Sequence, residues 1–356
     1  MCVKILDSVK EVTLKTKTKC SIYDLDTHRF LDRSFLARSG TKFIYRQDGI
    51  RIGEQGFSAK NIRIAPAKKK CLNVNGVLYR GDIDLIEDGG SLLVVNRVFL
   101  EDYLKGVLPR EVHHFWPFSA LKAQAIASRS YALFKIQHSE NGKYDLTADT
   151  YSQVYGGRSS ERWRTSKAVD GTKGMVLEYD GKVLPAYFHS CCGGYTRDAS
   201  PRWGDQPAPL KSVKCQWCRW SPYFRWQVKI PTKEITEKLN DSGIPVKKII
   251  DIKEGERDKS QRLADIRVRT RHEWFEIPVR DFRAALGKRL IKSDNFRIKK
   301  YPRFYLFGGY GWGHGVGMCQ WGAFGLSIRF WKAERILKYY YPGAEIVKMK
   351  ELELSR

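Results

Sequence analysis

The order in which strand-like and helix-like segments follow one another constrains the fold of this chain most. Over the first ninety residues, polar and apolar residues alternate in short runs separated by turn residues, as in TKFIYRQDGIRI (41–52) and KNIRIAPA (60–67). A longer run, FSALKAQAIASRSYALFKIQH (118–138), is the clearest predicted helix, with Ser119 as its expected N-cap. Because strands and helices do not alternate regularly, the sequence predicts a mixed α+β fold over a doubly wound α/β fold.

We expect a β-rich N-terminal part at residues 1–90 and a helix-bearing core at residues 91–356. In the core, FLEDYLKGVLP (99–109) predicts a short helix that stops before Pro109. Further on, TKEITEKLN and VRDFRAALG predict helices among strands. These segments form an expected α/β insertion at about residues 232–300.

Composition limits the class of protein. The 356 residues are 42% hydrophobic, which suffices for one large core or two modest ones. No run of eighteen apolar residues exists, so no membrane span is predicted. The start, MCVKILDSVKEV, lacks the apolar segment and cleavage site of a signal peptide. The sequence therefore predicts either a cytoplasmic protein or a trimmed mature form.

The formal net charge of +25 indicates either a well-solvated basic surface or a surface that binds a polyanionic partner. Nucleic acid, anionic lipid and anionic cell-wall glycan are the polyanions to consider. The basic residues are spread along the chain, and no nucleic-acid-binding module is recognisable. We therefore expect no nucleic-acid partner, and a zinc-stabilised nucleic-acid binder remains the weaker alternative.

Four of the eight cysteines crowd together between residues 191 and 218. YFHSCCGGYT and KCQWCRW contain His-x2-Cys and Cys-x2-Cys pairs, and two such pairs can grip a tetrahedral zinc ion. The predicted ligands are His189, Cys192, Cys215 and Cys218, with Cys191 able to replace Cys192. Two disulfides or free thiols are the alternative. Four protein ligands leave no open position, so one structural zinc per chain is predicted, held by zinc-type loops at 189–218.

A candidate catalytic carboxylate lies in GVLPREVHHFWPFSALKAQ, where Glu111 precedes the long predicted helix. The aromatic residues Phe115, Trp116 and Phe118 follow at once. A carboxyl group beside apolar rings loses hydration, which raises its pKa and suits it to general-acid catalysis. The alternative is an ordinary solvated loop glutamate.

Several motifs in one order resemble the SpoIID/LytB family of sporulation proteins and amidase enhancers. They are EDYLKGVLPREVHHFWPFSALKAQAIASRSYAL, YDLTADTYSQVYGG, AYFHSCCGGYT, FRAALGKRLIKSDNF and GYGWGHGVGMCQWGAFG. The resemblance implies a peptidoglycan lytic transglycosylase that cuts MurNAc–GlcNAc β-1,4 bonds and leaves 1,6-anhydro ends. It implies Glu111 as the acid/base, and a preference for glycan stripped of stem peptides. The zinc assignment depends on the cysteine spacing more than on the family.

Residues that could contact the glycan come from three segments. The candidates are Gln124, Arg129 and Tyr131 on the long helix, Gln153 and Tyr155 after it, and His314 and Gln320 in the glycine-rich stretch at 309–325. Tyr131 and Tyr155 could instead be core aromatics, and His314 could be a structural histidine bonded to backbone. We expect the glycines to let a sugar chain approach the backbone closely, and no role is predicted for Cys319.

The expected partners follow from the resemblance. They are peptidoglycan glycan strands and, in the alternative function, a cell-wall N-acetylmuramoyl-alanine amidase that this protein would enhance without cutting glycan. Peptidoglycan lies outside the cytoplasmic membrane. The expected location is therefore the periplasm or cell-wall compartment, with the export signal or anchor absent from this sequence.

Overall fold

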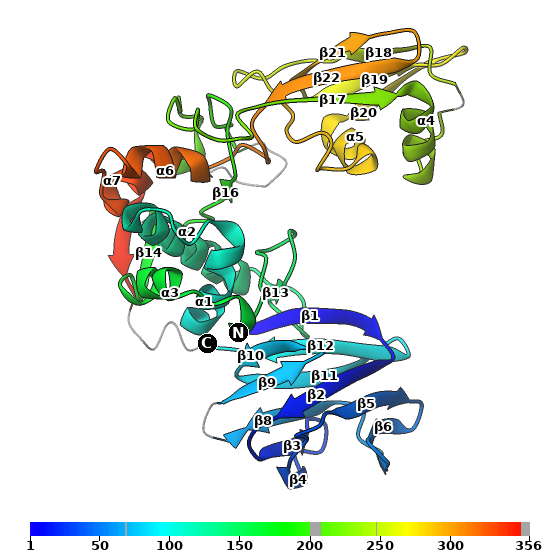
Figure 1. Cartoon of the computed structure of the whole chain (residues 1–356), viewed down its shortest axis with the longest axis vertical. Coiled ribbons are helices and arrows are strands. Elements are labelled where there is room, and N and C mark those ends of the chain that lie inside the picture. The colour runs from blue at the N-terminus through cyan, green and yellow to red at the C-terminus, as the bar shows by residue number, and fades with distance from the viewer. Residues whose placement is uncertain (68–69, 200–207, 247, 350–356) are drawn as a thin grey trace. The chain divides into compact units, whose positions relative to one another are not determined.

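The computed structural model describes residues 1–67, 70–199, 208–246 and 248–349 of the chain. These residues form two compact units (Figure 1). The first comprises Met1–Pro185 with the described residues from Ile346 onward, and the second comprises Ala186–Glu345. Each unit contains both helices and strands, so the expected mixture of helix and sheet is confirmed. The division expected at residue 90 and the insertion expected at about 232–300 stay predictions.

The first unit contains two large sheets, whose strands come mainly from the region predicted to be β-rich. The strands are β1 (Cys2–Val9), β2 (Glu11–Thr16), β3 (Cys20–Asp24), β4 (Phe30–Phe35), β5 (Thr41–Arg46), β6 (Gly49–Ile52), β7 (Gln55–Phe57), β8 (Ile62–Pro66), β9 (Cys71–Val74), β10 (Val77–Arg80), β11 (Asp82–Asp88), β12 (Ser91–Arg97) and β13 (Leu146–Thr147). Seven strands pair in the order β13-β1-β12-β11-β8-β3-β4, and six in the order β10-β9-β2-β5-β6-β7.

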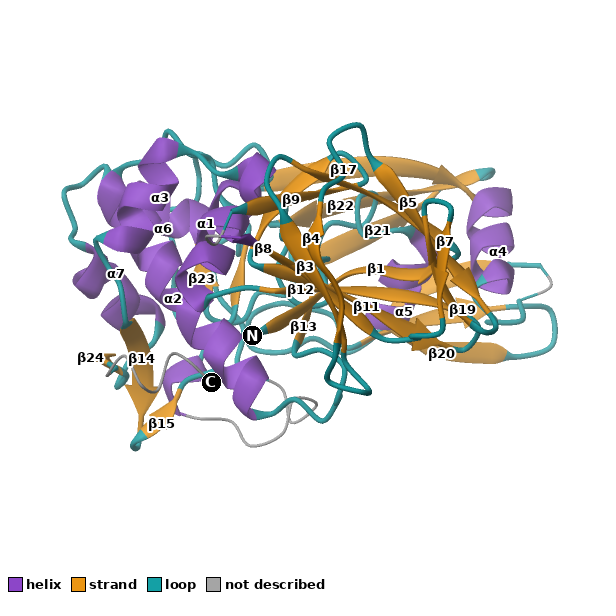
Figure 2. Cartoon of the chain, turned by 90° about the horizontal axis from the view of Figure 1, so that it is seen from below, coloured by secondary structure: helices purple, strands orange, loops and turns teal. Residues whose placement is uncertain are grey.

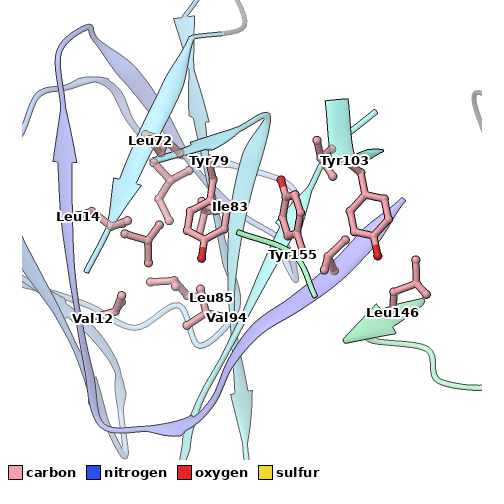
Figure 3. Close-up of a cluster of buried hydrophobic side chains, with 14 of the residues drawn as sticks. Val12, Leu14, Leu72, Tyr79, Ile83, Leu85, Val94, Tyr103, Leu146 and Tyr155 are labelled. Carbon is pink, nitrogen blue, oxygen red and sulfur yellow. The ribbon is translucent and has the colours of Figure 1, made fainter. Parts of the chain in front are cut away.

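The alternation of polar and apolar residues determines which face of these strands is buried. In β3 and β8, buried positions alternate with half-buried ones, as expected where only one face of a strand meets the core. A turn at Gly89 and Gly90 joins β11 to β12, with Asp88 opposite Ser91. Figure 3 shows the resulting cluster of apolar side chains, in which Tyr79, Tyr155 and Tyr103 lie in a row.

Three helices gather at one end of these sheets (Figure 2). They are α1 (Leu100–Glu111), α2 (Phe118–Gln137) and α3 (Trp163–Asp170), and a short 3-10 turn, η2 (Arg158–Ser160), precedes α3. A small sheet, β15-β14-β24, completes the unit; its strands are β14 (Met175–Tyr179), β15 (Lys182–Val183) and β24 (Glu345–Lys348).

Two details of the predicted helices were wrong. α1 does not stop before Pro109 but continues to Glu111. The N-cap of α2 is Pro117, so Ser119 lies inside the first turn, and no side chain caps this end. α2 is also buried on nearly all sides: every residue from 120 to 133 except Lys122 is buried. Its many alanines and serines leave room for α1, α3 and β14 to pack around it.

The described residues of the second unit form small sheets and four helices. Its strands are β16 (Phe188–His189), β17 (Arg225–Pro231), β18 (Asp251–Glu254), β19 (Asp265–Arg269), β20 (Trp274–Pro278), β21 (Phe296–Lys300), β22 (Phe304–Tyr310) and β23 (Met318–Cys319). Its helices are α4 (Thr232–Asp241), α5 (Val279–Leu286), α6 (Gln320–Ser327) and α7 (Ala333–Tyr340), with a 3-10 turn η4 (Ala208–Leu210). The sheets are β17-β22-β21, β18-β19-β20 and the parallel pair β16-β23.

One apolar core joins the two three-stranded sheets of the second unit to α4 and α5. Ile235 on α4, Phe282 on α5 and Phe307 on β22 are fully buried in it. Separately, the parallel pairing of β16 with β23 sets His189 opposite Cys319. This pairing joins the cysteine-rich segment to the glycine-rich stretch within the second unit.

Candidate functional site

The end of α1 is shaped by Pro109 and by a segment that docks on the helix. A proline inside a helix removes one intrahelical hydrogen bond and bends the helix. Near this proline, the carbonyl of Gly106 accepts hydrogen bonds from Ser160 Oγ (2.7 Å) and from the Gly156 amide (3.2 Å). The segment from 154 to 160 is thereby held against the last turns of α1.

Gly106 allows this segment to lie close to the helix. A Cβ at this position would come within 2.5 Å of the Tyr155 ring. Tyr155 is buried, its hydroxyl donates to Asn96 Oδ1 (2.9 Å), and its ring centroid lies 4.9 Å from that of Tyr103. These contacts make Tyr155 a core aromatic, which is the alternative that the sequence left open.

Glu111 is the last residue of α1 and is partly buried. Its Oε1 accepts a hydrogen bond from the Val154 amide (2.9 Å), which orients the carboxyl group. The expected aromatic surroundings are arranged differently. Trp116 packs against a small apolar cluster around Val112, whereas Phe115 is 69% exposed.

Arg129 on α2 is fully buried, and its guanidinium is engaged within the protein. Nε and Nη2 donate to the Glu101 carboxylate at 2.9 and 2.7 Å, and Nη1 donates to the Met175 carbonyl at 3.0 Å. A buried arginine bonded in this way fastens α2 to α1 and to β14. Its position therefore favours a structural role over the predicted contact with substrate.

The other candidates near α2 are buried. Gln153 accepts from the Tyr103 hydroxyl (3.3 Å) and donates to the Ser128 carbonyl (3.3 Å). Gln124 donates to the Ser128 hydroxyl (3.1 Å), and its Oε1 has no hydrogen-bond partner among the described residues. Tyr131 is 9% exposed. Their contact with glycan stays a prediction.

Sequence reasoning missed Tyr151, which lies three residues before Val154 and is 80% exposed. Phe115 and Tyr151 are thus exposed aromatic residues on two segments connected to Glu111. Phe115 follows Glu111 along the chain, and Tyr151 precedes Val154, whose amide donates to the Glu111 carboxyl group. No pattern in the sequence separates such an exposed ring from the buried tyrosines nearby, because both occur in irregular segments.

Four buried cysteines of the second unit form a cluster that could hold a metal ion. The Sγ atoms of Cys192, Cys215, Cys218 and Cys319 all lie within 4.8 Å of one another. Around zinc, a Zn–S distance of about 2.3 Å separates tetrahedral sulfurs by about 3.8 Å, so a small contraction would suffice. The cluster contains three of the predicted ligands. Cys319 stands in the place predicted for His189.

Hydrogen-bond donors are directed at these sulfurs. The amides of Cys192 and Gly322 each donate to Cys319 Sγ at 3.3 Å, and the Gly194 amide donates to Cys192 Sγ at 3.4 Å. The Tyr340 hydroxyl lies 3.1 Å from Cys215 Sγ. Donors around sulfur stabilise thiolates, which are the form that binds a metal ion.

His189 and His314 lie beside the cluster, with ring centroids 5.5 Å apart. His189 Nδ1 is 3.1 Å from the Val316 carbonyl, and its buried Nε2 has no hydrogen-bond partner among the described residues. His314 Nδ1 accepts from the Val316 amide (3.2 Å), and Nε2 lies 2.8 Å from the Phe188 carbonyl. Burial lowers the pKa of His189 well below its usual value and that of His314 to about 4. His314 therefore matches its structural alternative.

The glycines of 309–325 serve packing within the protein. Gly317 has φ of +69°, and a Cβ there would lie 2.0 Å from the Tyr187 carbonyl oxygen. At Gly315, a Cβ would lie 2.6 Å from the guanidinium of Arg262. We expected the space beside these glycines to be open to a sugar, but at these two positions other residues of the protein occupy it. Gln320 is buried, and its Nε2 has no hydrogen-bond partner among the described residues.

Arg262 is a second residue that the sequence did not single out. It is fully buried and donates from Nη2 to the Cys192 carbonyl (2.9 Å), while Nε and Nη1 lack partners among the described residues. The nearby carboxylates are already paired: Asp294 with Arg197 and Arg283, and Asp258 with Arg197. Three guanidinium groups thus meet two carboxylates, which leaves an excess of positive charge beside the cysteine cluster.

Comparison with known proteins places the chain in a family. A family model described as stage II sporulation protein matches residues 88–179, which include Glu111, and a model for a domain of unknown function matches residues 215–317. An uncharacterised protein of Brachyspira hyodysenteriae is 35% identical over 84% of this chain and 80% of its own length. Stage II sporulation protein D of Bacillus subtilis is 32% identical over 71% of this chain and 75% of its own. The chain belongs to the SpoIID family.

A further relative has a different name. The amidase enhancer of Bacillus subtilis is 27% identical over 68% of this chain and 40% of its own length. Family members thus include a sporulation protein and an amidase enhancer. No helix within the described part of the chain combines the length and apolar character needed to cross a membrane.

Proposed function

We propose that this protein is a peptidoglycan lytic transglycosylase that uses Glu111 as its acid and base. The carrying observation is that the carboxyl group of Glu111 lies within the region matched by the family model and is oriented by the Val154 amide. The substrate would be glycan strands without stem peptides, cut at MurNAc–GlcNAc β-1,4 bonds. Exposed rings on Phe115 and Tyr151 offer faces on which sugars could stack.

One carboxyl group suffices for this reaction. Protonated Glu111 gives its proton to the glycosidic oxygen as the bond from that oxygen to C1 of MurNAc breaks. The C6 hydroxyl of the same MurNAc then bonds to C1, and the Glu111 carboxylate accepts its proton. The product is a 1,6-anhydro ring, no water is consumed, and Glu111 ends protonated as it began. A hydrolytic glycosidase would instead need a second carboxyl group.

The test is product analysis with native protein and with Glu111→Gln. Glutamine keeps the shape of the side chain and an oxygen that can accept from Val154, but it cannot transfer the proton. Stem-peptide-free glycan should yield 1,6-anhydro ends, one water lighter than reducing ends, only with native protein. Reducing-end products would show a hydrolase, and equal products from both proteins would remove Glu111 from the chemistry.

The alternative is a wall-binding protein that enhances an amidase without cutting glycan, and the relative with that name favours it. A shared fold does not by itself transfer catalysis. The two functions separate in one experiment, in which a cell-wall amidase digests peptidoglycan with native protein or Glu111→Gln added. Equal stimulation by both, without anhydro products, would establish the alternative.

We further propose that Cys192, Cys215, Cys218 and Cys319 hold one structural zinc ion. Four thiolates close the coordination sphere, so the ion would fasten the β16–β23 region without taking part in catalysis. The excess positive charge at Arg262 supports this, because a zinc ion with four thiolates carries two negative charges. Four neutral thiols would leave that guanidinium without compensation.

Because the proposed substrate is peptidoglycan, we infer that the protein works in the periplasm or cell-wall compartment. Fractionation of cells that express the full reading frame tests this, and recovery in the cytoplasmic fraction alone would contradict it.

A further inference from the structure

A strongly basic pocket lies in the first unit. Its volume is about 570 Å³, and it is formed by β2, β9, β10 and η2, with the segments that adjoin them. Six cationic side chains line it, and no carboxylate does: Lys15, Lys17, Arg38, Lys70, Arg80 and Arg158.

Most of this charge is not compensated within the protein. Arg80 is paired with Glu161 through two hydrogen bonds, of 2.6 and 2.9 Å. Lys15, Lys17 and Arg38, by contrast, form no ion pair with any described residue. Like charges around one hollow repel each other, and an anion placed there relieves the repulsion. The pocket therefore has the chemistry of an anion-binding site.

One segment connects this pocket to Glu111. Arg158 lines the pocket, and Val154, whose amide binds Glu111, precedes it by four residues. Their Cα atoms are thus at most about 14 Å apart. Ser159 Oγ accepts from the Leu78 amide at the pocket (2.9 Å), and Ser160 Oγ donates to α1. The pocket and the carboxyl group consequently belong to one continuous piece of structure.

We propose that this pocket binds carboxylate groups of the same glycan strand that Glu111 would cut. A MurNAc residue without its stem peptide carries a lactyl carboxylate directly on the sugar, and such carboxylates recur along the strand at every second sugar. A glycan strand bound with its scissile bond at Glu111 would place the lactyl carboxylate of a neighbouring MurNAc residue in the pocket. This inference rests on the proposed function and adds a second binding subsite to it.

The experiment measures binding separately from cleavage. Glu111→Gln protein is mixed with insoluble stem-peptide-free glycan, and the bound fraction is determined over a range of protein concentrations. The pocket variant adds Lys15→Gln and Lys17→Gln. The matched control adds Lys60→Gln and Arg46→Gln, which remove the same charge from exposed positions of the same unit outside the pocket.

We expect the pocket variant to bind about five- to tenfold more weakly and the control less than twofold more weakly, because each exposed ion pair contributes modestly. Glycan whose lactyl carboxylates have been converted to amides should bind the parent protein at least as weakly as native glycan binds the pocket variant, because the variant keeps four of the six cationic side chains. Equal losses in both variants, or undiminished binding of amidated glycan, would overturn the inference.

The result of this binding experiment does not depend on whether the protein is a lytic transglycosylase. If native protein forms no anhydro ends while the pocket variant still loses glycan binding selectively, the transglycosylase proposal fails and the carboxylate subsite stands. If anhydro ends form but the pocket and control variants bind alike, the subsite fails and the transglycosylase stands.

Discussion

Replacing Glu101 by glutamine tests whether Arg129 holds the first unit together. The Glu101 carboxylate accepts two hydrogen bonds from the fully buried Arg129 guanidinium and a third from the Gly174 amide (3.2 Å). Glutamine has the same shape but is neutral. It also turns an –NH2 group toward a guanidinium that can only donate.

The expected cost follows from burial. Removing one partner of a buried ion pair costs about 3–5 kcal/mol, because the other charge is left uncompensated. The Glu101 side chain is 18% exposed, so water screens the pair slightly and we take the lower end, about 3 kcal/mol. For a unit of this size, each kcal/mol lowers Tm by about 2–4 °C, so a fall of about 6–12 °C is expected.

Chemical and thermal unfolding, followed by circular dichroism, measure the change. Asp170→Asn is the control: it breaks the Lys105–Asp170 pair (2.9 Å), in which Asp170 is 60% exposed, and should cost no more than about 1 kcal/mol. If Glu101→Gln is no more destabilising than this control, the ion pair does not hold α1 to α2.

Three further results are expected. Cys319→Ser should abolish a zinc content of about one per chain, measured by elemental analysis, whereas His189→Gln should retain it; the reverse would restore histidine as the ligand. The depressed pKa of His314 means that the folded state binds fewer protons than the unfolded state between pH 6.5 and 4. His314 should therefore contribute its full stabilisation above pH 6.5 and lose about 2 kcal/mol of it from pH 7.5 to 5, so in urea titrations His314→Gln should lose about 2 kcal/mol less than native protein over this range, the loss due to His189 remaining in both. Gly106→Ala should destabilise the protein by about 1–3 kcal/mol although alanine favours helices, since its Cβ would strike the Tyr155 ring; a more stable variant would contradict that packing.

Local patterns in the sequence predicted the β-rich N-terminal part and several individual elements. The alternating runs at 41–52 and 60–67 contain β5, β6 and β8, because side chains on one face of a strand must meet the core wherever that strand lies, and the run at 118–138 contains α2. The error at the end of α1 has another origin. α1 continues past Pro109 where the Gly106 carbonyl is bonded by a segment fifty residues away along the chain. Helix propensity depends on the residues of the helix itself and does not include a contact with a distant segment.

At the candidate site, the sequence by itself determined which chemical groups are present. Glu111 was identified through its motif and three cysteines through their spacing. Both are patterns of residues that lie close together along the chain, so they can be recognised without a structure. Tertiary structure decided which distant groups meet. It brought Cys319 to the cysteine cluster, paired Arg129 with Glu101 in the interior, and gathered the basic residues around one pocket. Coordination and charge compensation depend on distances in space, and these are set only when strands and helices from separate parts of the sequence pack together.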